Sequence, residues 1–113
     1  LEAAEDHAIP LLPGIAPPTE AMTAAEHGYS FLKFFPAEAL GGSNVLKAYA
    51  SPLPDITFCP TGGITMEKAK TYLALPNVIC VGGSWTMPAD AIAAGDWKRI
   101  EGLAREAAAL KQA

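Results

Sequence analysis

A lysine stands in the middle of an apolar run in the stretch FLKFFPAE, residues 31–38. Strand alternation places Lys33 on one face of this run between Phe31 and Phe35, and the other face is apolar as well. Apolar surroundings keep an amine neutral, because desolvation disfavours its charged form, and a neutral amine forms Schiff bases with carbonyl compounds. The alternative is a structural lysine that protects an edge strand or whose ammonium reaches water. Two apolar faces favour a central strand and a nucleophilic Lys33.

Two glycine pairs follow the next two apolar runs. The stretches FCPTGGI (58–64) and ICVGGSW (79–85) each pass from an apolar run into Gly-Gly. Glycine lets backbone N–H groups approach an anion without interference from Cβ, although a single pair at a strand end more often just makes a turn. Together the two pairs predict a phosphate site. Trp85 would either pack beside this site or form one side of the pocket. The candidate groups of this site are the two pairs, Gly62-Gly63 and Gly82-Gly83, with the hydroxyls of Thr61 and Ser84 beside them.

Strands and helices that alternate along the chain must position these residues. Apolar runs at residues 9–15, 31–35, 56–59 and 78–81 predict four buried strands. Strict alternation of strand and helix is typical of a parallel sheet. Four such units form either a small open sheet or half of a (β/α)8 barrel, a fold that commonly binds phosphate after strands seven and eight.

Capping residues and apolar periodicity predict the helices. The main helices are expected to begin at Thr19, Ser43, Thr65 and Asp96. A short extra helix is expected at residues 88–93, where proline suits the first helical position. The last helix carries an apolar stripe from Trp97 onward, and such stripes usually belong to the core.

Composition excludes several classes of partner. A net charge of −4 and a pI near 5.0 provide no basic surface for nucleic acid or anionic lipid. No apolar stretch reaches the roughly 20 residues that cross a bilayer, and the acidic start is unlike a signal peptide. Cys59 and Cys80 lie in separate apolar runs without metal-ligand spacing. We therefore expect a cytoplasmic protein without a metal, a membrane span or a nucleic-acid partner.

The motifs, taken in order, resemble a known family. KFFPAE (33–38), the pair Gly41-Gly42, FCPTGGI and VGGSW (81–85) are similar in combination and spacing to the C-terminal half of the 2-keto-3-deoxy-6-phosphogluconate (KDPG) aldolase family. That family also acts on 4-hydroxy-2-oxoglutarate. The likeness extends from Pro10 to the last helix, which is nearly the whole chain.

The resemblance implies a fold and a set of site residues. The fold would be α/β, the (β/α)8 TIM barrel, with residues 1–113 as the C-terminal half of a single domain, about four βα units. Lys33 would be the Schiff-base lysine. The residues that would line the substrate and phosphate end are Thr61, Gly62, Gly63, Gly83 and Ser84. Phe35 would pack near the pyruvyl group, and Pro13 would help to close the end of a neighbouring strand.

The implied activity is a class I aldol cleavage in the Entner–Doudoroff pathway. Lys33 would form an iminium with the phosphorylated 2-keto acid, and cleavage between C3 and C4 would release glyceraldehyde 3-phosphate and then pyruvate. The resemblance implies no metal or organic cofactor, and it implies a homo-oligomer, commonly a trimer.

The resemblance also implies that the general base lies outside this chain. In the family the base is a glutamate on an early strand, so we expect the chain to be inactive without an N-terminal half as its partner. Glu38, the acid nearest to Lys33, is expected to be solvated or to favour a helix dipole. Two other hypotheses stay open: a phosphate-binding isomerase or synthase barrel with a structural Lys33, and a non-catalytic half-barrel module that binds phosphate.

Overall fold

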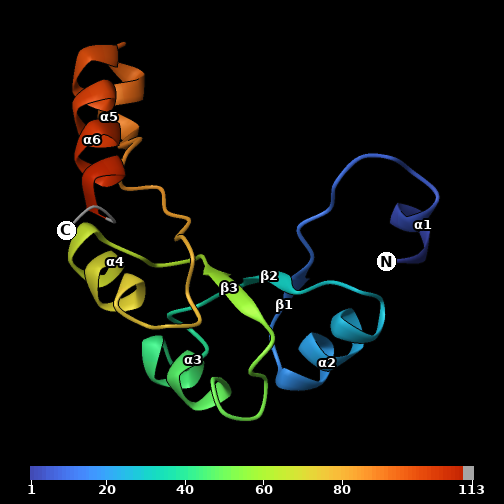
Figure 1. Cartoon of the computed structure of the whole chain (residues 1–113). Coiled ribbons are helices and arrows are strands. Elements are labelled where there is room, and N and C mark those ends of the chain that lie inside the picture. Colours follow the sequence, from blue (N-terminus) through green and yellow to red (C-terminus); the bar gives the residue numbers. More distant parts are fainter. Residues whose placement is uncertain (111–113) are drawn as a thin grey trace.

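The structure is a computed structural model that describes residues 1–110. Its three strands form one parallel sheet in the order β1-β2-β3, so β2, which carries Lys33, is the central strand (Figure 1). The central position that the sequence predicts is therefore confirmed. The elements in chain order are α1 (Glu2–Glu5), β1 (Gly14–Ile15), α2 (Pro18–Glu26), β2 (Phe31–Phe34), α3 (Ser43–Tyr49), β3 (Thr57–Pro60), α4 (Met66–Leu73), α5 (Ala89–Ala93) and α6 (Trp97–Ala109).

The two faces of the sheet have different environments. Lys33 is level with Gly14 on β1 and with Cys59 on β3, and residues level in a parallel sheet share a face. Leu32 and Phe34 point to the opposite face and are fully buried. They share one core with buried residues of α2, α3 and α4, which Figure 1 shows on that side of the strands. This core fixes the direction in which Lys33 points.

The expectation of a half-barrel with four βα units is wrong. Residues 1–110 contain a three-stranded parallel sheet and six helices. The predicted fourth strand at 78–81 makes only isolated bridges, Phe58 to Val78 and Thr61 to Gly82. The first predicted strand, at 9–15, is shortened to two residues, and Ile9 is 79% exposed.

Pro60 explains why the fourth run does not continue as a strand. Phe58 donates its N–H to the carbonyl of Asn77 at 2.8 Å, and Ile79 donates back to Phe58 at 3.2 Å. The next donor on β3 would be Pro60, which has no N–H and cannot extend the ladder. Between the two bridges the chain advances by three residues from Phe58 to Thr61, and by four residues from Val78 to Gly82. The fourth run therefore contains one extra residue where the pairing resumes.

Two of the predicted helix starts are confirmed by side-chain caps. Thr65 Oγ1 accepts the Lys68 N–H at 3.3 Å, and an Asp96 carboxylate oxygen accepts the Arg99 N–H at 3.1 Å. The prediction for Thr19 is off by two positions, because Pro17 is the N-cap of α2. Proline suits helix entry because the first N–H groups of a helix lack partners in any case.

The predicted core stripe of α6 is wrong at its first residue. Trp97 is 65% exposed, and none of the residues 97–109 is buried. Figure 1 shows α5 and α6 standing together at one side of the sheet, with the N-terminal segment at the other. The radius of gyration is 15.5 Å, against about 13 Å for a compact domain of this length. The C-terminal end of the stripe is covered, because Leu110 packs against the core and lines a cavity with Leu73 and Trp85, whereas Trp97 at its start is not covered.

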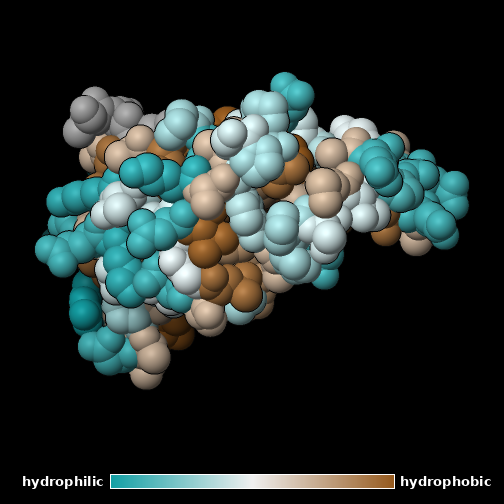
Figure 2. Space-filling model, turned by 90° about the horizontal axis from the view of Figure 1, so that it is seen from below, coloured by the Kyte–Doolittle hydropathy of each residue, from teal (hydrophilic) through white to brown (hydrophobic). Residues whose placement is uncertain are grey.

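Apolar surface also remains elsewhere on the molecule. Figure 2 shows hydrophobic surface between hydrophilic areas on the face seen from below. None of the helices within residues 1–110 is long and apolar enough to cross a membrane. The large apolar side chains that are about half exposed or more include Phe35, Met87, Trp97 and Ile9.

Candidate active site

Lys33 projects from the centre of the sheet toward an aromatic ring. Its backbone N–H donates to the Pro13 carbonyl at 2.8 Å, which fixes the strand position. Its Nζ lies 5.1 Å from the centroid of the Phe35 ring, a distance at which the ring face attracts a cation. The lysine is half-buried, and Phe35 is 50% exposed. The amine is therefore less enclosed than the apolar sequence predicts.

A cavity of about 340 Å³ brings together the predicted phosphate residues. Its lining comes from the turn after β2, the loop after β3 and the segment after the interrupted fourth run. The lining residues are Phe35, Thr61, Gly62, Gly63, Gly83, Ser84 and Met87. We call residues 61–63 the first glycine loop and residues 82–84 the second glycine loop. Since Phe35 lines this cavity and also lies under the Lys33 amine, the ring joins the two parts of the site.

The first glycine loop needs its glycines for conformation and for space. Gly62 and Gly63 have φ values of +105° and +74°, a region that favours glycine. A Cβ on Gly62 would lie 3.2 Å from the Phe35 ring and from the Pro36 backbone. The loop can therefore lie directly against the turn that follows the Lys33 strand.

The second glycine loop lies beside the first. Gly82 donates its N–H to the Pro60 carbonyl at 2.9 Å, and a Cβ on Gly82 would lie 2.5 Å from Thr61 Oγ1. A Cβ on Gly83 would overlap the indole of Trp85. Trp85 lines a separate apolar cavity of about 160 Å³, which favours its packing role over a wall of the phosphate site.

Glu38 is partly exposed but paired with two side chains, and it does not lie at a helix start, which differs from the expectation for it. One carboxylate oxygen accepts from Lys68 Nζ at 2.6 Å, and the other accepts from the Tyr72 hydroxyl at 2.7 Å. The pKa of Glu38 is below its ordinary value. The largest cause is the hydrogen bond from Lys68, and the next is the hydrogen bond from Tyr72. The Tyr72 pKa is raised, first by burial and then by Glu38. Glu38 is thus held as a carboxylate and is a poor general base.

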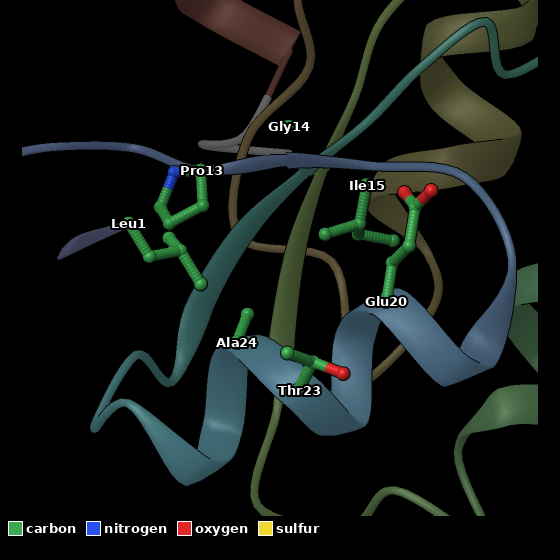
Figure 3. A pocket seen from close by; sticks show the side chains of 7 residues that line it. All are labelled: Leu1, Pro13, Gly14, Ile15, Glu20, Thr23 and Ala24. Carbon is green, nitrogen blue, oxygen red and sulfur yellow. The ribbon is translucent and has the colours of Figure 1, made fainter. Parts of the chain in front are cut away.

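Pro13 lies away from the cavity that holds the other predicted residues. It lines a second cavity of about 210 Å³ between β1 and α2 (Figure 3). The polar side chains there are already engaged, because Glu20 accepts the Ala16 N–H at 3.0 Å and Thr23 donates to the Thr19 carbonyl at 3.0 Å. We assign no chemistry to this second cavity.

Sequence reasoning missed three residues of the site. Met87 lines the main cavity, and Lys68 and Tyr72 hold Glu38. The spacing of Lys68 and Tyr72 on one face of α4 is visible in the sequence, but their partner is 30 or more residues away. Within residues 1–110, no three His, Cys, Asp or Glu side chains gather closely enough to hold a metal ion.

Comparisons with known proteins point to one family. The family model for KDPG and KHG aldolase matches residues 1–103. The 2-dehydro-3-deoxy-phosphogluconate aldolase of Pseudomonas aeruginosa is 51% identical over 95% of this chain and 49% of the relative. The KHG/KDPG aldolase of Escherichia coli K12 is 52% identical over 95% of this chain and 50% of the relative. The chain therefore spans about half the length of the curated relatives it matches.

Solved structures agree with the sequence comparison. A KDPG aldolase from Legionella pneumophila, with pyruvate captured as a covalent carbinolamine intermediate, has a TM-score of 0.87 and 47% identity, covering 90% of this chain and 50% of that chain. The 2-keto-3-deoxy-6-phosphogluconate aldolase of Zymomonas mobilis with 3-phosphoglycerate has a TM-score of 0.84 and 45% identity. The match covers 96% of this chain and 50% of that chain.

Proposed function

Because this chain belongs to the KDPG and KHG aldolase family, we propose that it serves a class I aldol cleavage in which Lys33 forms the Schiff base. The observation that carries the proposal is the position of the Phe35 ring, which lies under the Lys33 amine and lines the cavity of both glycine loops. The Legionella pneumophila relative, which holds pyruvate as a covalent carbinolamine, supports it. A carbinolamine is the first adduct of an amine with a ketone.

The proposed reaction begins with attack of the Lys33 Nζ lone pair on the C2 carbonyl of a 2-keto acid. The carbinolamine loses water to give an iminium cation, and the Phe35 ring lies where it favours a positive nitrogen. A base removes the C4 hydroxyl proton, and the C3–C4 bonding electrons move toward the iminium. The aldehyde leaves, and the enamine is protonated at C3 and hydrolysed to pyruvate and the free amine.

The cavity supports a phosphorylated substrate, 2-keto-3-deoxy-6-phosphogluconate, cleaved to pyruvate and glyceraldehyde 3-phosphate. In this proposal the two glycine loops bind the phosphate through backbone N–H groups and through the hydroxyls of Thr61 and Ser84. The Zymomonas mobilis relative, solved with 3-phosphoglycerate, supports a phosphorylated ligand. The family name includes KHG, so 4-hydroxy-2-oxoglutarate is the second substrate that we propose.

We assign no general base to the described residues, because Glu38, the acid nearest to Lys33 in the sequence, is held by two partners. That the chain is inactive without further residues, and that it forms a trimer, both stay predictions. An assay of the 113-residue chain for pyruvate release, together with its mass by light scattering, tests them.

Reductive trapping tests the proposed nucleophile. Incubation of the intact protein with pyruvate and sodium borohydride should reduce the iminium to a stable secondary amine on Lys33, found by peptide mass spectrometry. Lys33→Met should abolish the adduct. The matched control Lys47→Met removes an exposed lysine of α3 and should leave the adduct unchanged.

The same experiment separates the aldolase from the alternatives. An isomerase, a synthase or a non-catalytic module with a structural Lys33 would give no adduct at this position. An adduct on another lysine, or no adduct in the unmodified protein, would remove Lys33 from the mechanism.

A further inference from the structure

The Glu38 carboxylate connects two segments that carry different parts of the site. Glu38 belongs to the turn at residues 35–42, which directly follows the Lys33 strand. Its two partners, Lys68 and Tyr72, lie one helical turn apart on α4, which directly follows the first glycine loop. The Glu38 carboxylate therefore joins the turn on the nucleophile side of the site to the helix on the phosphate side.

One of the two anchors of Glu38 is rigid. Tyr72 is 1% exposed and belongs to the hydrophobic core, so its hydroxyl has a fixed position. The Lys68 side chain is 50% exposed and that of Glu38 is 28% exposed. Gly42 closes the other side, because a Cβ there would lie 3.3 Å from the Glu38 carboxylate and 3.5 Å from the Tyr72 hydroxyl.

The backbone and side chain of Glu38 also contact the first glycine loop directly. Its N–H donates to the Gly62 carbonyl at 3.2 Å, next to a hydrogen bond of 2.8 Å from Ala37 to Thr61. A Cβ on Gly63 would lie 2.9 Å from Glu38 Cβ and 3.1 Å from Cγ. The Glu38 side chain thus lies against Gly63, one of the glycines that line the cavity.

From these contacts we infer that Glu38 is a positioning residue, which holds the first glycine loop in register with the strand that carries Lys33. The inference rests on the proposed function, because it concerns the phosphate end of that site. Glu38 touches neither the amine nor the reacting carbons in this role. It sets the geometry of the backbone N–H groups that bind phosphate, and its pairing with Lys68 and Tyr72 keeps it from acting as a base.

The test compares binding at the two ends of the site in the intact protein. Glu38→Ala should weaken the binding of 3-phosphoglycerate, measured by calorimetry, by about tenfold or more, the size expected when a charge-assisted hydrogen bond is lost. Borohydride trapping of pyruvate on Lys33, which involves no phosphate, should change by less than about twofold. In turnover the KM for the phosphorylated substrate should rise more than kcat falls.

A matched control and a second variant keep the test decisive. Glu67→Ala removes an exposed glutamate from the first turn of the same helix and should leave 3-phosphoglycerate binding unchanged. Tyr72→Phe keeps the buried ring and deletes only the hydroxyl, so it should weaken binding in the same direction. The double variant should be no weaker than Glu38→Ala, because both changes break one connection. If Glu38→Ala does not fold, Tyr72→Phe decides.

The outcomes distinguish this inference from the proposed function. Failure of the unmodified protein to trap pyruvate removes the aldolase proposal, whereas the 3-phosphoglycerate comparison still decides the role of Glu38. Equal binding by Glu38→Ala, Tyr72→Phe and the unmodified protein overturns the inference. Absence of 3-phosphoglycerate binding in the unmodified protein, or an equal loss of phosphate binding and pyruvate trapping in the variants, overturns it as well.

Discussion

The Lys33 amine and the Gly62 backbone meet the same aromatic ring, that of Phe35. The Lys33 nitrogen lies 5.1 Å from the ring centroid, and a Cβ on Gly62 would lie 3.2 Å from two ring carbons. The Phe35 side chain therefore lies between the Lys33 amine and the first glycine loop and sets the distance between them. A change in this ring alters both the electrostatics at the amine and the shape of the cavity.

Phe35→Leu should lower kcat/KM for aldol cleavage by about two- to thirtyfold, because a cation near an aromatic face gains about 0.5 to 2 kcal/mol. The rate of borohydride trapping with pyruvate should fall with it. Phe31→Leu is the matched control, since Phe31 shares the sheet face but lies two residues before the lysine and outside the cavity lining. Equal effects of the two changes would contradict the role of the Phe35 ring.

Gly83→Ala should lower the free energy of unfolding by about 1 to 3 kcal/mol, the usual cost of forcing a methyl group into a packed site. The new Cβ would overlap the Trp85 indole, which must shift. Urea unfolding, followed by tryptophan fluorescence, measures both effects. Gly102→Ala in α6 meets nothing within 4 Å, so it should stabilise the protein by about 0.5 to 1 kcal/mol through helix propensity. Similar stabilities for both variants would argue against the Gly83 packing.

Ser84→Asp should raise KM for 2-keto-3-deoxy-6-phosphogluconate by about fivefold or more, because it brings a carboxylate toward a phosphate in the cavity, and like charges at close range cost about 1 kcal/mol or more. The KM for pyruvate in the reverse reaction should change little. Ser51→Asp adds the same charge at an exposed turn outside the lining and serves as the control. An unchanged KM in Ser84→Asp would count against the phosphate site.

The stability that Glu38 contributes should depend on pH. Its pKa in the folded protein is lowered from the ordinary 4.5, first by Lys68 and then by Tyr72. A lowered pKa stabilises the fold above the ordinary value, and this contribution disappears as the pH falls through the folded-state pKa. The difference in unfolding free energy between the unmodified protein and Glu38→Gln should therefore be constant near neutral pH and shrink below about pH 4.5.

Urea unfolding at several pH values checks this expectation. Glu67→Gln on the same helix is the control, and its difference from the unmodified protein should show a smaller pH dependence. A Glu38→Gln difference that stays constant down to pH values well below 4.5 would show that the carboxylate pairing does not stabilise the fold.

Local features of the site were readable in the sequence. The sequence predicted a reactive amine at Lys33, between aromatic residues, and an anion-binding site at the glycine pairs beside Thr61 and Ser84. The structure brings the glycine pairs to one cavity. Thr65 and Asp96 predicted helix starts correctly, because a cap is a hydrogen bond to a residue three positions away. Parallel pairing also followed from the alternation of strand and helix.

Contacts between distant segments were not readable. Pro60 is visible in the sequence, but its effect depends on which strand lies beside it, and so the fourth run was wrongly predicted to be a strand. Trp97 looked like a core residue, but the structure leaves it 65% exposed at the start of α6, and it is Leu110 beyond the other end of the helix that packs against the core. Glu38 looked solvated because its two partners are 30 and 34 residues away. The sequence by itself determined the chemical groups and the local elements, since these depend on neighbouring residues. The tertiary structure alone decided the register, the burial and the partners, since these depend on which elements meet in space.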